Sequence, residues 1–487
     1  MFYSIQHFEE ISIKVFQKAV KQFHTDPTDM ASFVSAVQDE LTNLGLQILK
    51  EAIEQVDEAI RQSPERKDSW VVDRKLPKQL ITSLGTVTFQ KTLFKHKQTG
   101  ERVFLLDNAL GLEPHERLTE DTKVRILEET AESSYRKGGI AGSRDALSKE
   151  TVKNIIHDLT FPEEAPARKL KQVEYLYLEA DEDHTSLQFY DHRGDLECDA
   201  NGRKMNSIIT KLVYVHEGVR KTAPGSGRRE LINPHYFCPI NQHTNNHQFW
   251  DEVARYLDTH YDLSKVKRIY LNSDGGSWIK AGMHHIPGVQ FVLDEFHLEK
   301  YLTKLTSHMK DSIDDAKQEL RTVIREKNKT DFDEVVERLK LSLTSESRIQ
   351  RIDEYAGYIK SNWAGAKRRM RHKDGVVGSS TEGHVSHVLA SRMSSRPMGW
   401  SRLGAANMAR LRAYTLNGGD VLTLVRLQKR KLPKAAGSDF EGFTCSNVIH
   451  MENEYQRHAH KYIDHWDGRI SAEIQQKEWF KALNGYL

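Results

Sequence analysis

The sequence predicts a multidomain α/β protein in which a mixed β-sheet is flanked by helices and interrupted by an all-helical segment. At 487 residues the chain is too long for one ordinary domain. Between about residues 166 and 297, strand patterns first follow one another and then alternate with helical patterns, which indicates a mixed sheet covered by helices. From about 298 to 373 the pattern is polar and helical and contains no strand signal.

Composition limits the classes of protein to consider. The 71 basic residues are almost balanced by 69 acidic ones, so any contact with nucleic acid must come from local patches. Cys198, Cys238 and Cys445 include no C-x-x-C pair, which argues against a disulfide framework and a cysteine-based zinc site. The start of the chain lacks a signal-peptide core, and no apolar run approaches the ~18 residues of a membrane-spanning helix. We therefore expect a soluble intracellular protein.

The first 118 residues predict a helical region at 1–70 and a small β-rich segment at 71–118. Apolar residues recur at threes and fours between Asp29 and Gln62, and Pro64 ends that helical run. The stretch TVTFQKTLFKH, a turn at Gln98-Thr99-Gly100-Glu101 and the stretch RVFLLD together predict a hairpin.

The segment 119–165 predicts three short helices. Its middle contains the turn Gly138-Gly139, and its last helix opens at Ser148. This arrangement is typical of a helix-turn-helix DNA-binding region, in which Lys149 and Lys153 are candidates for groove or phosphate contacts. The alternative is a generic three-helix bundle, because such patterns are common.

Acidic residues follow two of the predicted strands. Asp181 ends the strand YLYLEAD, on the same strand face as Tyr177, Glu179 and Asp183. Asp274 ends the strand KRIYLNSD and is followed at once by Gly275-Gly276 and a helix. Carboxylates beside a glycine turn at the ends of strands are typical of active sites on α/β sheets. Aspartate is also a common turn former, and Asp183 competes with Asp181 because both point the same way.

A third acidic candidate, Glu382, begins a helix after the long helical stretch. Mg²⁺ and Mn²⁺ prefer hard oxygen ligands, and phosphodiester chemistry uses two such ions ~4 Å apart. Three inward-facing carboxylates can hold two Mg²⁺ or Mn²⁺ ions, which is the cofactor we expect. The alternative is structural, since Ser379-x-x-Glu382 also fits a capping box at the start of a helix.

Four motifs in order along the chain carry a resemblance to a known family. They are ADED, SDGGSWI, LDEFHLEKYL and STEGHVSHVLASRMSSRPMGWS. In this order they resemble bacterial insertion-sequence transposases, more narrowly a family long catalogued as uncharacterised bacterial proteins and related to Mutator-type transposases. The resemblance covers nearly the whole chain. Its most specific pieces are Asp274-Gly275 with Trp278-Ile279, Asp294-x-x-His297, and Glu382 followed by Arg392 and Gly399-Trp400.

The resemblance implies a DDE transposase with an RNase H-like catalytic domain. Residue by residue, it makes Asp181, Asp274 and Glu382 the three catalytic, metal-binding carboxylates. The 108 positions from Asp274 to Glu382 suit the all-helical insertion of Mutator-like enzymes. Asp294 and His297 match the Cys/Asp-x-x-His signature of that superfamily, and the histidine would position DNA or water or tune the metal shell. Its structural alternative is a histidine that bridges a strand and a helix.

Basic clusters near these acids are candidates for contacts with the DNA backbone. One lies in the loop that holds Arg228 and Arg229, and another precedes Glu382. A charge run is usually only a solvated face, but clusters around a phosphodiester site fit phosphate contacts better. The members of the second cluster are Lys367, Arg368, Arg369, Arg371 and Lys373.

The full expectation is a cytoplasmic, nucleoid-associated bacterial enzyme that binds terminal inverted repeats and target DNA as a dimer or higher oligomer. It would catalyse metal-dependent strand cleavage and strand transfer. Two alternatives stay open: another RNase H-like nuclease, and a catalytically inactive DNA-binding relic. The expected parts after residue 165 are the first part of the RNase H-like domain at 166–309, the helical insertion at 310–378, the Glu-bearing part at 379–435 and a tail at 436–487.

Overall fold

The computed structural model describes residues 3–429, except 190, 191, 193, 195, 197, 199–201, 240–242, 374 and 397. The expected tail at 436–487 lies outside the described residues. The chain divides into two compact units: unit 1 takes 1–125, 139–147 and the chain from 429, and unit 2 takes 126–138 and 148–428. The expected helix-turn-helix segment at 119–165 is therefore divided between the two units rather than forming one of its own.

Unit 1 begins with helices. They are α1 (Tyr3–His7), a π-helical turn (Phe8–Ser12), α2 (Ile13–Thr25), α3 (Met30–Gln62) and α4 (Pro64–Ser69). The predicted long helix is confirmed as α3, whose N-cap Asp29 accepts a hydrogen bond from the backbone N–H of Ser32. Pro64 ends α3 as expected and also opens α4, because proline fits the first position of a helix.

A three-stranded sheet packs beside α3. Strand β1 (Trp70–Thr82) pairs antiparallel with β2 (Gly85–His96), and β3 (Arg102–Val103) adds two residues on the other side of β2. The predicted hairpin of β2 and β3 is thus only partly right, since RVFLLD turns into α5 (Leu105–Ala109). The sequence prediction missed β1, because an edge strand with exposed charges and Pro77 lacks a clear strand pattern.

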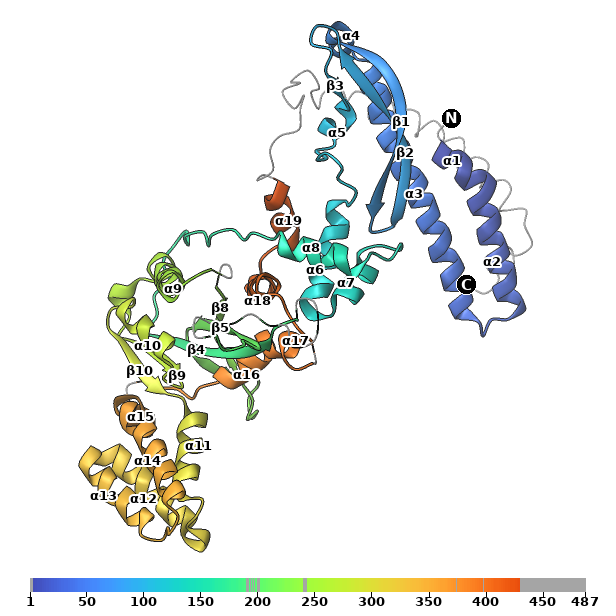
Figure 1. Ribbon diagram of the computed structural model, residues 1–487. Helices are drawn as coiled ribbons and strands as arrows, with labels where there is room; N and C mark the ends of the chain where they lie inside the picture. The colour runs from blue at the N-terminus through green and yellow to red at the C-terminus, as the bar shows by residue number, and fades with distance from the viewer. Residues whose placement is uncertain are drawn as a thin grey trace. The chain divides into compact units, whose positions relative to one another are not determined.

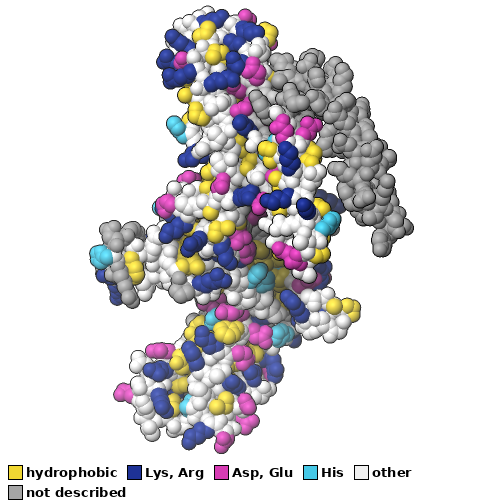
Figure 2. All heavy atoms as spheres, turned by 90° about the vertical axis from the view of Figure 1, so that its right-hand side faces the viewer, with side chains coloured by type: hydrophobic (Ala, Val, Ile, Leu, Met, Phe, Trp, Pro, Cys, Tyr) yellow, Lys and Arg dark blue, Asp and Glu magenta, His cyan; other side chains and the backbone are white. Residues whose placement is uncertain are grey.

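Basic side chains gather at the end of unit 1 where α4 lies beside these strands, as Figure 2 shows. The exposed cations on these elements and in the turn after β2 are Lys67, Arg74, Lys75, Lys95, Lys97 and Arg102. Arg102 pairs with Asp73, so acidic neighbours offset part of the local charge.

The three helices expected between residues 119 and 160 are present as α6 (Glu120–Glu132), α7 (Tyr135–Gly142) and α8 (Lys149–His157). Helix α8 lies in unit 2 and buries Val152 and Ile156. It packs against α18 (Arg402–Leu416), where the Asn407 amide donates to the carbonyl of Ile156 at 2.8 Å. The last helix of the expected DNA-binding region is therefore built into the fold of unit 2.

Unit 2 is a mixed α/β unit centred on a mixed five-stranded sheet, as expected (Figure 1). Strands β10, β9 and β4 run parallel, and β5 and β8 continue the sheet antiparallel. The spatial order is β10 (Val289–Leu293), β9 (Arg268–Ser273), β4 (Tyr175–Ser186), β5 (Ser207–His216) and β8 (His235–Phe237). A small separate hairpin is formed by β6 (Val219–Lys221) and β7 (Arg229–Leu231).

The two faces of β4 differ in chemistry, as strand alternation predicts. Leu176, Leu178 and Ala180 belong to an apolar core with side chains of α9 (Asn246–His260) and α10 (Ser277–Ala281). The opposite face carries Tyr177 and Glu179, so the polar chemistry of the sheet is concentrated there.

The expected all-helical stretch is confirmed. It consists of α11 (Glu295–Thr306), α12 (Ile313–Glu326), α13 (Lys329–Lys340), α14 (Glu346–Ser361) and α15 (Trp363–Arg371), with a short 3₁₀ turn (Lys310–Ser312) between α11 and α12. These helices enclose a hydrophobic core that also takes in Phe291 and Leu293 of β10, and they gather at one end of unit 2 (Figure 1). Helix α15 returns to the sheet, where Gly365 lies so close to Phe291 that an added Cβ would come within 2.4 Å of its ring.

The chain after α15 returns along the sheet to α16 (Thr381–Val385), a π-helical turn (Ser386–Ala390), α17 (Ser391–Met393), α18 and α19 (Val421–Lys429). Arg392 and Trp400 have structural contacts. The Arg392 guanidinium lies 4.9 Å from the centre of the Trp400 ring, and the backbone N–H of Trp400 donates to the carbonyl of Ser186. In the described part of the chain, no helix is long and apolar enough to cross a membrane.

Candidate active site

The register of the central strands brings Asp181 and Asp274 to the same level of the sheet. Glu179 pairs with Asn272 across β4 and β9, and the two aspartates each follow two residues later. β9 ends at Ser273, but β4 continues to Ser186 because β5 pairs with its whole second half. The prediction that Asp181 ends its strand is therefore wrong: it stands within β4, where the parallel pairing stops.

Asp181 shares an electrostatic environment with the other predicted acids. The pKa of Asp181 is raised to about 6, mainly by burial; the negative charges of Asp274 and Glu382 contribute to this rise, and His297 opposes it. The N–H of Glu182 also donates to Asp181 Oδ1 at 2.8 Å, which favours the charged form. Residues that are distant along the chain thus act electrostatically on Asp181.

Asp274 occupies a tight turn against the helical insertion. Its Oδ1 accepts the N–H of Gly276 at 2.8 Å, and its backbone carbonyl accepts the hydroxyl of Tyr358, the latter at 2.5 Å. Gly275 has a φ of 88°, and an added Cβ would lie 2.4 Å from Asn362 Oδ1. A glycine is required by both the backbone angle and the space, so the end of α14 helps to set the position of Asp274.

Asp294 and His297 form a pair at the start of α11. Asp294 is the N-cap of the helix and accepts the backbone N–H of His297 at 3.1 Å, while His297 Nδ1 lies 3.2 Å from the same carboxylate. The hydrogen bond to Asp294 raises the pKa of His297, and Asp274 and Asp181 add to this. His297 therefore links the end of β10 to α11, which agrees with the structural alternative given for it above. It also interacts electrostatically with Asp274 and Asp181.

Glu382 lies exposed in the first turn of α16. The predicted capping box is wrong: the N-cap is Ser380, and no side chain makes a cap hydrogen bond there. The interaction of Glu382 with Asp181 described above is electrostatic. A role as a helix cap is thus removed, and a chemical role remains a prediction.

Asp183, the competitor of Asp181, is engaged elsewhere. Its carboxylate is buried and accepts the hydroxyl of Ser394 at 2.8 Å and that of Thr185 at 3.3 Å. Asp274 and Glu382 act electrostatically on Asp181, and its role as the first catalytic carboxylate stays a prediction.

The donor set of this group fits a hard divalent cation in its chemistry. Carboxylate oxygens are ligands that such a cation prefers, and the negative charges of Asp274 and Glu382 that act on Asp181 are charges that a cation would offset. Among the residues that the structure describes, however, no three His, Cys, Asp or Glu side chains are grouped closely enough to hold a metal ion. The carboxylates are thus the right type of ligand for a hard divalent cation, but the described residues do not form a coordination geometry for one.

One predicted DNA contact, Arg369, is corrected by the structure. Its side chain is 1% exposed, and it donates to the carbonyl of Leu293 at 3.0 Å and to Asn272 Oδ1 at 2.7 Å. It cannot reach a phosphate, because it ties α15 to the ends of β9 and β10.

The other predicted cations lie at the surface. Lys367, Arg368 and Arg371 each donate to a backbone carbonyl, and Lys373 is exposed. Arg228 and Arg229 are exposed at the hairpin of β6 and β7. On α8, Lys149 is exposed, and Lys153 forms an ion pair with Glu150. DNA contact by these residues stays a prediction.

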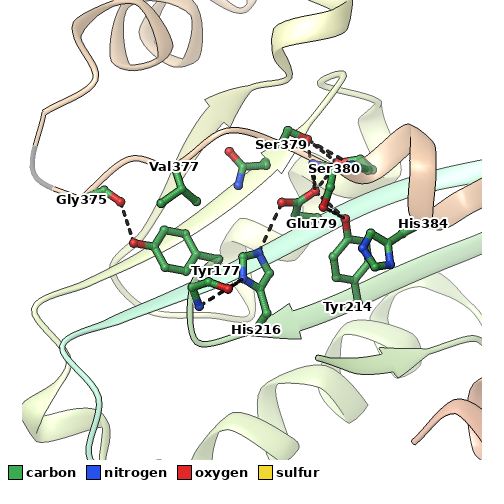
Figure 3. A network of polar contacts seen from close by, with 12 residues as sticks. Tyr177, Glu179, Tyr214, His216, Gly375, Val377, Ser379, Ser380 and His384 are labelled. Atoms are coloured by element: carbon green, nitrogen blue, oxygen red, sulfur yellow. Dashed lines mark hydrogen bonds and ion pairs between the residues drawn. The ribbon is translucent and has the colours of Figure 1, made fainter. Parts of the chain in front are cut away.

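The sequence prediction assigned no role to Glu179, which Figure 3 places at the centre of a polar network. Its buried carboxylate joins β4 to Tyr214 and His216 of β5 and to the chain just before Glu382. Strand alternation had already placed Glu179 on the face of Asp181. Its partners just before Glu382 are about 200 positions away, so no local sequence pattern indicates these contacts.

Comparison with known proteins identifies relatives over most of the chain. The model of the family described as "Uncharacterised protein family (UPF0236)" matches residues 25–431. A protein of that name from Caldanaerobacter subterraneus subsp. tengcongensis is 34% identical over 394 residues, which cover 81% of this chain and 80% of the relative. Another from the same organism is 33% identical over 416 residues, or 85% and 83% of the two chains.

A solved structure also matches at low similarity. It is the Drosophila P element transposase strand transfer complex, which covers 69% of this chain and 83% of that one at 11% identity. The TM-score of 0.22 is too low to relate the two folds.

Proposed function

The chain belongs to the uncharacterised protein family UPF0236, whose name assigns no activity, and we propose that it is the DNA transposase of an insertion sequence. The observation that carries the proposal is the register of β4 and β9, which brings Asp181 and Asp274 to the same level of the sheet, and Glu382 adds its charge to the electrostatic environment of Asp181. Asp181 stands within β4, Asp274 directly follows the adjacent parallel strand β9, and Glu382 comes after a helical insertion. This is the order expected of an RNase H-like domain with a DDE triad.

In this proposal Asp181, Asp274 and Glu382 would supply carboxylate oxygens to two Mg²⁺ or Mn²⁺ ions. When bound, such ions stabilise the charge on the attacking and leaving oxygens of a displacement at phosphorus. Tyr358 and the Gly275 turn keep Asp274 in place, and Asp294 holds a proton on His297 Nδ1 beside the acids. A protonated His297 would attract the DNA phosphate and orient it toward the carboxylates.

The proposed reaction has two balanced steps. In the first, a water oxygen bonds to phosphorus at the element's end as the bond to the 3′ oxygen breaks, which leaves a 3′-hydroxyl and a 5′-phosphate. In the second, that 3′-hydroxyl attacks a target phosphodiester, and the target's 3′ oxygen leaves. Neither step needs a covalent bond between protein and DNA. Because two element ends must meet, the working complex is at least a dimer.

The test uses the full chain, DNA that carries the element's terminal repeats, and Asp274→Asn. We expect Mg²⁺- or Mn²⁺-dependent nicking and joining that stops in chelator and in this variant, because an amide cannot replace the carboxylate charge. Asp258→Asn on α9 is the matched control, since Asp258 is an exposed acid outside the group. Full activity of Asp274→Asn would contradict the DDE assignment.

The same assay separates the two alternative functions. Equal cleavage of repeat and scrambled DNA without joining would favour a general RNase H-like nuclease. Specific binding without any cleavage would favour a catalytically inactive DNA-binding relic.

A further inference from the structure

The carboxylate of Glu179 is a buried junction between the central strand and the segment that leads to Glu382 (Figure 3). Glu179 is 0% exposed and lies on β4, two residues before Asp181. Its Oε1 lies 3.3 Å from His216 Nε2. Its Oε2 accepts from Tyr214 OH at 2.5 Å, Thr381 Oγ1 at 2.7 Å, Ser380 N at 2.9 Å and Ser379 Oγ at 3.1 Å.

These donors make a charged carboxylate tolerable inside the protein. A buried carboxylate without partners would take up a proton, because burial disfavours the charged form. Here Tyr214, Thr381 and the N–H of Ser380 donate to Oε2, and His216 Nε2 lies beside Oε1. Glu179 is therefore charged, and its hydrogen bonds are of the stronger, charge-assisted kind.

Three of the donors are consecutive residues, Ser379, Ser380 and Thr381, and Glu382 follows directly. Ser379 Oγ also lies 2.6 Å from Thr381 Oγ1, so the segment is folded around the carboxylate. Helix α16 has only five residues and lacks a side-chain cap of its own. Apart from the local bond from the N–H of Thr381 to Ser379 Oγ at 3.3 Å, the start of α16 therefore depends on this contact with β4.

The geometry of β4 connects this contact with the acidic group. Residues two apart in a strand project from the same face, ~7 Å from each other. Glu179 and Asp181 share the polar face in this way. A carboxylate that fixes Thr381 at one position of the strand therefore holds Glu382 near the next position, where Asp181 stands.

We propose that Glu179 is a positioning residue that fixes the start of α16 on β4 and thereby sets the distance between Glu382 and Asp181. This inference rests on the proposed function of the same site. Glu179 does not itself touch DNA or a metal ion in this scheme, because its oxygens are filled by protein donors.

The first experiment follows hydrogen exchange in the full-length Glu179→Gln variant. Gln keeps the size of the side chain but loses the charge, so the N–H of Ser380 loses its strong acceptor. We expect exchange in peptides over 376–385 to accelerate about tenfold or more, with peptides of α9 unchanged. Cleavage of repeat DNA should fall about tenfold or more while the affinity for that DNA is kept.

A second, milder pair of variants tests whether slower cleavage reflects only a general loss of stability. Thr381→Val removes one hydroxyl donor at the α16 end, and Thr306→Val is its matched control. Thr306 is also 0% exposed, and its hydroxyl donates to the carbonyl of Leu302 within α11 at 3.0 Å. We expect similar small losses of melting temperature in both. Only Thr381→Val should slow cleavage, and the double variant Glu179→Gln/Thr381→Val should cleave no more slowly than Glu179→Gln alone.

The outcomes separate this inference from the proposed function. Unchanged exchange over 376–385 in Glu179→Gln would overturn the anchor, and faster exchange with parental cleavage would overturn its effect on Glu382. Equal slowing by Thr306→Val would also overturn it, because the effect would then follow stability alone. If the parent chain cleaves no repeat DNA, the proposed function fails, while the exchange rates still decide whether Glu179 anchors α16.

Discussion

At the scale of single residues, Glu382 shows how charge and structure can be tested apart. Its side chain is exposed and caps no helix, so Glu382→Gln should melt within a few degrees of the parent. As a metal ligand it must supply negative charge, which a neutral amide cannot do. We predict that the variant binds terminal-repeat DNA but neither nicks nor joins it.

Melting curves, DNA binding and a cleavage assay together check this prediction. Cleavage by Glu382→Gln at nearly the parental rate would show that the third carboxylate lies elsewhere. The STEGHVSHVLASRM motif would then lose its catalytic meaning.

His235 predicts a pH dependence of stability. Burial, with the nearby charges of His260, Arg410 and Lys171, lowers the pKa of His235 from 6.5 to about 3. Between these values the unfolded chain binds a proton that the folded chain does not, so stability falls as the pH drops below 6.5. By pH 5 the loss from this group is ~2 kcal/mol. His235→Phe, which cannot bind a proton, should lack this part of the acid sensitivity.

The measurement is the free energy of unfolding of both proteins at pH 7 and at pH 5. The Phe variant can stack on Tyr256 as the histidine does, with ring centroids 4.2 Å apart in the parent. The Phe variant loses the contact with Asn417, which lowers its free energy of unfolding at both pH values. This loss cancels when the change between pH 7 and pH 5 is compared for the two proteins. An equal loss on acidification in both proteins would contradict the prediction.

Individual residues also show what the sequence can and cannot predict. Alternation along YLYLEAD placed Asp181 on the polar face, and a glycine turn marked Asp274. Arg369 was wrongly predicted to contact phosphate because only its charge was considered. Its position in the helix indicates burial, since it lies three residues after Ala366 and seven after Asn362, which are both buried. The positioning role proposed for Glu179 could not be predicted from the sequence, because it depends on hydrogen-bond partners that only the folded structure brings together.

At the scale of elements, the long and regular segments were predictable, and the short or exposed ones were not. Helix α3 and the all-helical stretch follow clear helical periods. Strand β1 combines charged residues with Pro77 and pairs along only one edge, so its strand pattern is weak. The length of β4 was underestimated since it is set by pairing with β5 rather than by its own sequence.

The turn between β9 and α10 gives a prediction with a built-in control. Gly275→Ala introduces a Cβ 2.4 Å from Asn362 Oδ1 at a φ of 88°, whereas Gly288→Ala meets nothing within 4 Å at a φ of 76°. Both substitutions should cost ~1–2 kcal/mol for the left-handed backbone. Only Gly275→Ala should cost clearly more and also abolish cleavage, because the clash displaces Asp274.

Thermal unfolding and the cleavage assay measure this difference. Asn362→Ala in the Gly275→Ala background should restore part of the lost stability, since it removes the atom in the way. Equal stability of the two alanine variants would show that the turn yields easily and does not fix Asp274.

At the scale of the whole molecule, charge is local rather than global. The net charge of +2 is small for a chain of 487 residues, so binding to DNA must rely on surface clusters such as the one in Figure 2. The division into units also differs from the expected parts, because α8 packs on α18 and belongs to unit 2. A fragment cut near residue 165 would uncover Val152 and Ile156, so DNA binding is best measured on the full chain.

The exposed face of α8 provides the last prediction. Lys149→Ala/Lys153→Ala removes two cations without touching the side of α8 that packs on α18, so the fold should persist. If these lysines contact phosphates, the affinity for terminal-repeat DNA falls, and the slope of log affinity against log salt decreases by about 1–2. Glu150→Gln is the control: it frees Lys153 from its ion pair, so it should bind DNA at least as well as the parent. Unchanged affinity and slope in the double variant would exclude α8 from the interface and direct the search to the exposed cations of β6 and β7 or of unit 1.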